Sequence, residues 1–207
     1  MNGVGVEDLA VERGGVPVLA GLRFAVAPGQ ALILRGPNGV GKTTLLRVLA
    51  GLQAPLAGRV VMEPESAAYA GHADGLKAML SVRENLRFWA ELYGRAFMEE
   101  EVLAAFDLGR LADRLAGTLS AGQKRRAGLA RLAVIGRDVL LLDEPTVSMD
   151  EASVGLFGRW LRERHLAAGG VAVIATHIDL GLEAGVLDLA PYRAAPTARG
   201  GADEVFL

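Results

Sequence analysis

The sequence has 207 residues, 51% hydrophobic and 22% charged, which suits one folded domain with a sizeable core and excludes a disordered chain. The formal net charge of −2 excludes a broad electrostatic attraction to nucleic acid or to an anionic membrane surface. There is no cysteine for disulfide bonds or thiolate metal sites, and no apolar run is long enough to span a bilayer, so we expect neither a secreted nor a membrane-spanning protein.

The N-terminal residues predict an antiparallel edge followed by the start of a parallel sheet. Apolar residues alternate with others in residues 4–26, with a break at Gly14 and Gly15, as in short antiparallel strands. An apolar run at residues 31–34 is followed by a glycine-rich turn and by leucines at helical spacing in residues 43–50. We therefore expect the order strand, loop, helix in this part of the chain.

Later segments complete an α/β domain. The apolar runs at residues 139–142 and 171–175 are continuous, as in parallel strands that are buried on both faces. Residues 76–114 are rich in Leu, Glu and Arg and predict a separate helical lobe. The tail, residues 191–201, contains Ala, Gly and Pro without periodicity, so we expect it to be loosely ordered.

The glycine-rich turn matches the phosphate-binding pattern G-x-x-x-x-G-K-[ST], and it lies between a predicted strand and a predicted helix. Backbone N–H groups of such a loop surround phosphate oxygens, Lys42 reaches the β- and γ-phosphates of ATP, and the Thr43 hydroxyl holds Mg²⁺. A glycine-rich turn without a ligand is the alternative, which the complete match disfavours. The residues expected to contact nucleotide here are Gly36, Pro37, Asn38, Gly39, Val40, Gly41, Lys42, Thr43 and Thr44.

Two carboxylates end the apolar run at residues 139–142. Asp143 is expected to hold Mg²⁺, and Glu144 is expected to polarise the water that attacks the γ-phosphate. A strand that ends in a solvated turn would also explain these residues. The phosphate-binding loop elsewhere in the chain favours the catalytic interpretation.

Residues 119–123, Leu-Ser-Ala-Gly-Gln, resemble the signature of the ABC ATPase family, which usually reads Leu-Ser-Gly-Gly-Gln. Ser120 is predicted to cap the helix that follows it, and a plain helix cap is the alternative to an anion site. The resemblance implies a homodimer in which Ser120, Gly122 and Gln123 of one subunit close on the γ-phosphate bound by the other. It also implies that Asp150 belongs to the D-loop.

The same resemblance implies that His177 is the switch histidine, which would sense the γ-phosphate and orient the attacking water. Lys42, Glu144 and His177 are then the catalytic residues. The implied fold is a P-loop NTPase of ABC ATPase type, with a mainly parallel central sheet, an antiparallel edge subdomain and a helical subdomain inserted at about residues 74–134. Residues 1–207 would form a single nucleotide-binding domain. His165 has no such role and is expected at the surface.

Two positions depart from the usual family pattern. Arg13 stands where most members have an aromatic residue that stacks on adenine. A guanidinium plane can also stack on a base, although an exposed arginine in a turn is the alternative. His72 stands in place of the usual lid glutamine, where it can contact Mg²⁺ through water.

These departures, together with residues 71–77 and 84–88, resemble one group within the family, the haem exporter ATPase subunits of cytochrome c biogenesis. That resemblance implies integral membrane partner subunits of the cytochrome c maturation complex. It also implies a peripheral location on the cytoplasmic face of the bacterial inner membrane. We expect no direct haem binding, since no histidine has a C-x-x-C-H context, and no nucleic acid partner.

Three alternatives remain open at this point. The chain could serve another ABC exporter, since the nucleotide chemistry is shared among them. It could be a non-transport ABC ATPase that acts on nucleic acid or ribosomes, although the short and slightly acidic chain disfavours this. It could also bind ATP as a scaffold without hydrolysis, which the intact catalytic residues disfavour.

Overall fold

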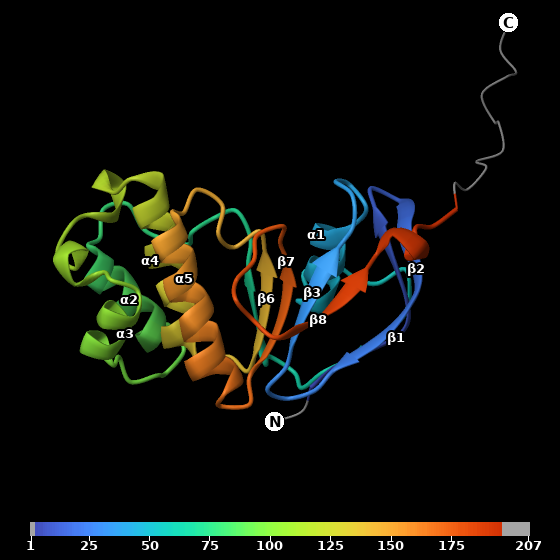
Figure 1. Cartoon of the computed structure of the whole chain (residues 1–207), viewed down its shortest axis with the longest axis horizontal. Coiled ribbons are helices and arrows are strands. Elements are labelled where there is room, and N and C mark those ends of the chain that lie inside the picture. The colour runs from blue at the N-terminus through green and yellow to red at the C-terminus, as the bar shows by residue number, and fades with distance from the viewer. Residues whose placement is uncertain (1–2, 196–207) are drawn as a thin grey trace, which may run out of the picture.

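The computed structural model describes residues 3–195 and contains two sheets with helices on one side and between them (Figure 1). The strands are β1 (Val4–Arg13), β2 (Val16–Val26), β3 (Ala31–Arg35), β4 (Ala57–Val61), β5 (Ala67–Ala70), β6 (Val139–Asp143), β7 (Val171–Ala175) and β8 (Ala184–Asp188). The helices are α1 (Lys42–Leu49), α2 (Val82–Leu92), α3 (Glu99–Ala105), α4 (Ala121–Ile135), α5 (Glu151–Trp160), η1 (Gly109–Leu111), η2 (Ala116–Thr118), the π-helix η3 (Leu161–Leu166) and η4 (Ala190–Tyr192).

The smaller sheet is antiparallel and has the strand order β2-β1-β4. β1 and β2 form a hairpin in which Val4 pairs with Val26 and Arg13 pairs with Val16. Gly14 and Gly15 form the turn with φ of 59° and 76°, a conformation that glycine adopts without steric cost. The predicted antiparallel edge is therefore confirmed.

The larger sheet is parallel and has the strand order β5-β6-β7-β3-β8. Every residue of β6 and β7 is buried because the two faces of these strands contact different hydrophobic clusters. Leu140 and Leu142 belong to the cluster that includes α5, and Val139 and Leu141 belong to the cluster that includes α1. The continuous apolar runs thus correspond to strands buried on both sides, as predicted.

The segment between β5 and β6 contains α2, α3 and α4, which lie together at the left of Figure 1, with α5 between them and the sheet. Ser81 and Ser120 begin α2 and α4, each with a capping box in which the serine side chain and the third helical residue exchange hydrogen bonds with the backbone. Leu86, Leu103 and Leu129 share one core with α5 and one face of the sheet. The helical segment is therefore packed against the sheet through a continuous core.

The prediction that residues 191–201 are loosely ordered is wrong for residues 191–195, which are the part that the structure describes. Residues 190–192 form η4, Leu19 forms a bridge with Arg193, and the Ala194 N–H donates to the Val18 carbonyl at 3.0 Å. This segment is ordered because it adds backbone hydrogen bonds to β2. Residues 196–201 of the predicted tail lie outside the described residues. Within residues 3–195 no helix combines the length and the apolar character needed to cross a membrane.

Candidate functional site

The glycine-rich loop joins β3 to the N-terminus of α1. Gly36, Gly39 and Gly41 have φ of 137°, 78° and 118°, values that other residues rarely adopt. A Cβ on Gly41 would also lie 3.0 Å from the side chain of Leu19. Lys42 Nζ donates to the Gly36 carbonyl at 2.8 Å, so the ammonium group lies across the loop at the positive end of the helix. This geometry suits an anionic phosphate group.

A hollow of about 270 Å³ opens beside this loop. It brings together a residue of the antiparallel sheet, the loop, the segment after β5 and the carboxylates after β6. The lining residues are Arg13, Val18, Asn38, Gly39, Gly41, Lys42, Thr43, Thr44, His72, Asp143 and Glu144. Most of the residues predicted to contact nucleotide or Mg²⁺ thus line one cavity, although Arg13 and Asp143 are 130 positions apart in the sequence.

The hollow has few groups of its own that could hold a divalent cation. Thr43 provides a hydroxyl oxygen and Asp143 provides a carboxylate. No group of three or more His, Cys, Asp or Glu side chains suited to a metal ion occurs within residues 3–195. This sparse oxygen set fits Mg²⁺ because Mg²⁺ in nucleotide sites keeps several waters and takes other ligands from the phosphates.

Asp143 is 2% exposed and is held by a residue that the sequence analysis did not identify. The Tyr69 hydroxyl donates to Asp143 Oδ2 at 3.2 Å. Burial, and then the charge of Asp143, raise the pKa of Tyr69 to about 12, so this hydroxyl keeps its proton at neutral pH. The two residues meet because β5 and β6 are adjacent parallel strands. The contact spans 74 sequence positions, and no local pattern could have indicated it.

Glu144 follows β6 in the left-handed region, with φ of 46°, which costs a non-glycine residue about 1 kcal/mol. Its N–H donates to the Ala175 carbonyl at 2.8 Å, which ties this position to the end of β7. His177 follows the same strand, and its Nε2 lies 3.8 Å from Glu144 Oε1. The predicted base and the predicted switch histidine are therefore neighbours, although His177 lies beside the hollow and not in its lining.

The signature residues lie apart from the hollow. The Ser120 hydroxyl accepts a hydrogen bond from the Gln123 N–H at 3.3 Å, and Gln123 Oε1 accepts one from the Ser120 N–H at 3.1 Å. Ser120 caps α4 as predicted. A Cβ on Gly122 would lie 2.8 Å from the Ser148 carbonyl oxygen, so this glycine permits close backbone packing. Among the described residues, Ser120, Gly122 and Gln123 are not part of the hollow's lining.

Asp150 is also outside the hollow. Its carboxylate accepts a hydrogen bond from the Ser153 N–H at 2.8 Å and caps α5. Hydrogen bonds from Ser153 lower the pKa of Asp150 below its usual value. In this chain Asp150 therefore has a structural role at a helix N-terminus, and the structure does not bring it to the phosphate-binding loop.

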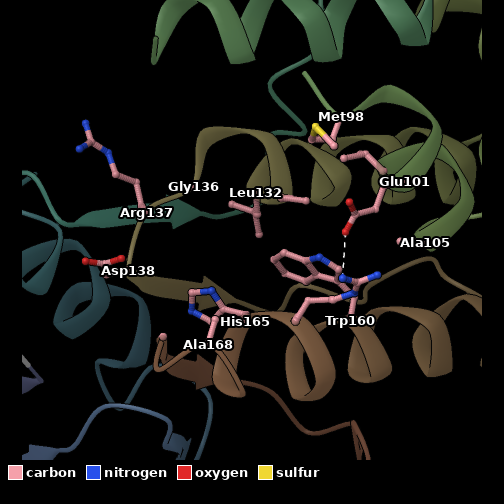
Figure 2. A pocket seen from close by; sticks show the side chains of 14 residues that line it. Met98, Glu101, Ala105, Leu132, Gly136, Arg137, Asp138, Trp160, His165 and Ala168 are labelled. Carbon is pink, nitrogen blue, oxygen red and sulfur yellow. Dashed lines mark ion pairs between the residues drawn. The ribbon is translucent and has the colours of Figure 1, made fainter. Parts of the chain in front are cut away.

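A second hollow, of about 350 Å³, lies between α3 and η3 and contains none of the predicted site residues (Figure 2). Glu101 and Arg164 form an ion pair of 3.0 Å at its edge. His165 stacks on Trp160, and its Nε2 lies 3.1 Å from the Val171 carbonyl oxygen. The expectation that His165 is a surface residue is wrong, since packing against the Trp160 ring makes it half-buried.

The strand, loop and helix around Lys42, with a buried carboxylate at the end of a neighbouring strand, define a P-loop nucleotide-binding protein. Residues 19–147 match the profile of the ABC transporter family. A putative ABC transporter ATP-binding protein from Pyrococcus furiosus has a similar structure, with a TM-score of 0.82 and 25% identity, over 93% of this chain and 100% of that one.

Two curated relatives are similar over nearly their whole length. The cytochrome c biogenesis ATP-binding export protein CcmA of Roseobacter denitrificans is 64% identical over 99% of both chains. The protein of the same name from Rhodobacter capsulatus is 63% identical over 97% of this chain and 94% of its own. The chain belongs to the ABC transporter family and, within it, to the cytochrome c biogenesis ATP-binding export proteins.

This membership confirms the family and the fold class predicted from the sequence. The protein is an ATP-hydrolysing ABC transporter subunit. As such a subunit it binds ATP and acts with membrane partner subunits.

Proposed function

We propose that the protein is the ATPase subunit of a bacterial ABC transporter complex for cytochrome c maturation, where it serves haem export or handling. The observation that carries this proposal is the 64% identity, over 99% of both chains, to a protein named for ATP-binding export in cytochrome c biogenesis. The nucleotide hollow supplies the chemistry that such a subunit needs, because it combines a phosphate-binding loop with a buried carboxylate and a second acid.

Within this site Lys42 and the loop N–H groups bind the β- and γ-phosphates. Thr43 and Asp143 would hold Mg²⁺, and Tyr69 orients the Asp143 carboxylate. When bound, Mg²⁺ neutralises charge that develops on the phosphate oxygens. Glu144 accepts a proton from the attacking water as general base.

His177 adds to the same step. Its Nε2 lies 3.8 Å from Glu144 Oε1, and from this position the ring would orient the attacking water and contact the γ-phosphate. At the other end of the hollow, Arg13 stacks on adenine through its guanidinium plane. His72, in the segment after β5, lines the same hollow and would contact Mg²⁺ through water.

Hydrolysis proceeds in a head-to-tail homodimer. This proposal is supported by the separation between the hollow and the signature, since Ser120, Gly122 and Gln123 lie outside its lining in the same chain. A second subunit would bring these residues to the γ-phosphate together with its Asp150. The N-terminus of α4, with its partial positive charge, is then a suitable partner for the phosphate.

The remaining features of the proposal concern the whole chain. Residues 1–207 act as one nucleotide-binding domain, in which the helical subdomain at about residues 74–134 contacts the membrane subunits. The protein is peripheral on the cytoplasmic face of the inner membrane, and it binds neither haem nor nucleic acid directly. The net charge of −2 supports association through protein partners instead of through the lipid surface.

The test is affinity purification of the tagged full-length chain from bacterial membranes, followed by identification of its partners and assay of ATP hydrolysis. Cytochrome c maturation membrane subunits together with MgATP hydrolysis are the expected result. A different permease would retain the ATPase mechanism and refute the assignment to cytochrome c maturation. Ribosomes or DNA-repair factors would refute a transport function altogether.

A further inference from the structure

The side chain of Arg125 lies buried between two loops of the nucleotide site. Arg125 is in the second turn of α4 and is 6% exposed. Its Nε donates to the Pro145 carbonyl at 2.6 Å, and its Nη2 donates to the Glu144 carbonyl at 3.0 Å. Its Nη1 donates to the Gly71 carbonyl at 2.6 Å and lies 3.4 Å from Oδ1 of Asp74. One guanidinium group therefore joins α4 to the loops after β5 and β6.

The chemistry of these contacts calls for arginine. β5 and β6 are adjacent parallel strands, with Ala70 opposite Leu142, so their following loops leave the sheet side by side. Three backbone carbonyls from these loops point at one buried position and need hydrogen-bond donors there. The guanidinium group offers five N–H donors in a fixed plane, whereas a lysine ammonium group is a compact donor on a flexible chain.

The two loops carry groups that line the nucleotide hollow. His72 directly follows Gly71, and Glu144 itself contributes one of the carbonyls. The Glu144 backbone has the unfavourable φ of 46°, and such a conformation persists only where surrounding contacts hold it. Arg125 donates hydrogen bonds to the backbone carbonyls of Glu144 and Pro145. The position of the Glu144 side chain thus depends on a group outside the hollow.

The same side chain also links these loops to the signature. α4 begins directly after Ser120. Because Arg125 fixes this helix to the two loops, it also fixes the position of the helix N-terminus relative to them. Arg125 does not belong to the lining of the hollow and lies against a neighbouring hollow of about 260 Å³ between the same loops and α4. Its effect on ATP must therefore pass through the residues that it holds.

We propose that Arg125 is a positioning residue for ATP hydrolysis, which orients Glu144 and His72 at the γ-phosphate end of the hollow. It also fixes the position of the start of α4 relative to these two residues. This inference rests on the proposed function of the hollow and of Glu144 as general base. The sequence alone shows an arginine after the signature and gives no indication of its three carbonyl partners.

The test compares Arg125→Gln, Arg125→Lys and wild type in the full-length chain, within the membrane complex that it forms. Without the guanidinium contacts, kcat should fall about 10- to 100-fold, as expected for a misplaced catalytic group, while the dissociation constant for ATP changes by less than about 3-fold. Arg125→Lys should show an intermediate kcat with the same unchanged affinity, because the ammonium group retains the charge but cannot place its donors in the fixed plane of a guanidinium group. If Arg125→Gln does not fold, Arg125→Lys alone carries the test.

Arg137→Gln is the matched control for loss of a partly buried arginine. The Arg137 side chain is 30% exposed and its guanidinium group lies over the Tyr93 ring at 4.9 Å, outside the nucleotide site. Its kcat should remain within about 2-fold of wild type. The proposal is overturned if kcat in the Arg125 variants falls no further than in Arg137→Gln, or if kcat and affinity fall by the same factor. A Glu144→Gln variant that still hydrolyses ATP would instead refute the proposed function of the hollow.

Discussion

The phosphate-binding loop and the signature both lie at the start of a helix. They differ in whether other predicted functional groups of the same chain lie beside them. Around Lys42 the loop, the Asp143 carboxylate and Glu144 line a shared hollow. Around Ser120 the side-chain groups bond to their own helix start, and the signature contributes nothing to that hollow. The difference teaches that the groups proposed to bind nucleotide come together within one subunit, whereas in the proposed dimer the signature is supplied by the other subunit.

Glu144→Gln should give the largest effect, because it removes the proposed general base from the nucleotide hollow. We expect hydrolysis to fall about 100- to 10,000-fold, with ATP binding retained and the dimer trapped in its closed form. Steady-state ATPase assays and size-exclusion chromatography at saturating MgATP measure the two parts. Glu100→Gln, which changes an exposed carboxylate on α3, should behave like wild type. Monomers of Glu144→Gln at saturating MgATP would count against the dimer.

Lys42→Ala should come next, since it removes the cation at the centre of the loop. The affinity for ATP should fall about 10- to 100-fold, the loss expected for a charge-assisted contact. Isothermal titration with ATP measures this directly. Lys77→Ala is the charge-matched control, because Lys77 packs over the Phe88 ring outside the hollow. Unchanged affinity in Lys42→Ala would overturn the assignment of the loop.

Ser120→Ala tests the role of the signature. We expect unfolding to become easier by about 1 kcal/mol through loss of the helix cap. Because the signature would act on the nucleotide of the other subunit, hydrolysis should fall about 10-fold, the loss expected for one hydrogen bond to a charged oxygen, while ATP binding to the monomer is unchanged.

Ser81→Ala provides the matched control, because Ser81 forms the same capping box at the start of α2. Thermal denaturation should show similar destabilisation for both serine variants, and only Ser120→Ala should lose hydrolysis. Equal ATPase rates in the two variants would mean that Ser120 is only a cap.

The smallest expected effect lies outside both regions, at His165. Burial lowers the pKa of His165, so the folded protein disfavours its protonated form. The unfolded chain then binds more protons, and stability is lost as the pH falls through the ordinary histidine value of about 6.5. We expect the melting temperature to fall between pH 7.5 and 5.5.

His165→Gln retains an amide near the Val171 carbonyl and removes the titrating ring. Differential scanning calorimetry should therefore show a flatter dependence of the melting temperature on pH in this variant than in wild type. The same slope in both proteins would assign the acid sensitivity to other groups.

Features that depend on residues close together in the sequence were predicted more accurately than features that depend on residues far apart in it. The phosphate-binding loop and the Ser120 cap depend on residues within one or two turns, and the sequence predicted both locations. Tyr69 and Arg125 could not be found in this way, because their partners are 74 and up to 54 positions away and become neighbours only through strand pairing. His165 is an exception, since its partners, the Trp160 ring and the Val171 carbonyl at the start of β7, are close to it in the sequence but form no pattern that indicates burial.

Strand prediction failed for a different reason. β4 and β8 lie at sheet edges, contain glycine and are mostly exposed or partly exposed, so they lack the apolar run that indicates a buried strand. Their pairing with β1 and β3 is a backbone interaction that side-chain patterns do not reveal. The fully buried β6 and β7 were predicted correctly because each of their residues faces a core.

The capping box of α4 limits what Gln123 can offer to anything that approaches it. An amide side chain has one carbonyl oxygen that accepts and one NH₂ group that donates. In Gln123 the oxygen already accepts a hydrogen bond from the Ser120 N–H at 3.1 Å, which uses one of its two lone pairs, whereas the capping box uses neither N–H of the NH₂ group. The helix start therefore presents Gln123 mainly as a donor, which favours electron-rich oxygen atoms over N–H or ammonium groups.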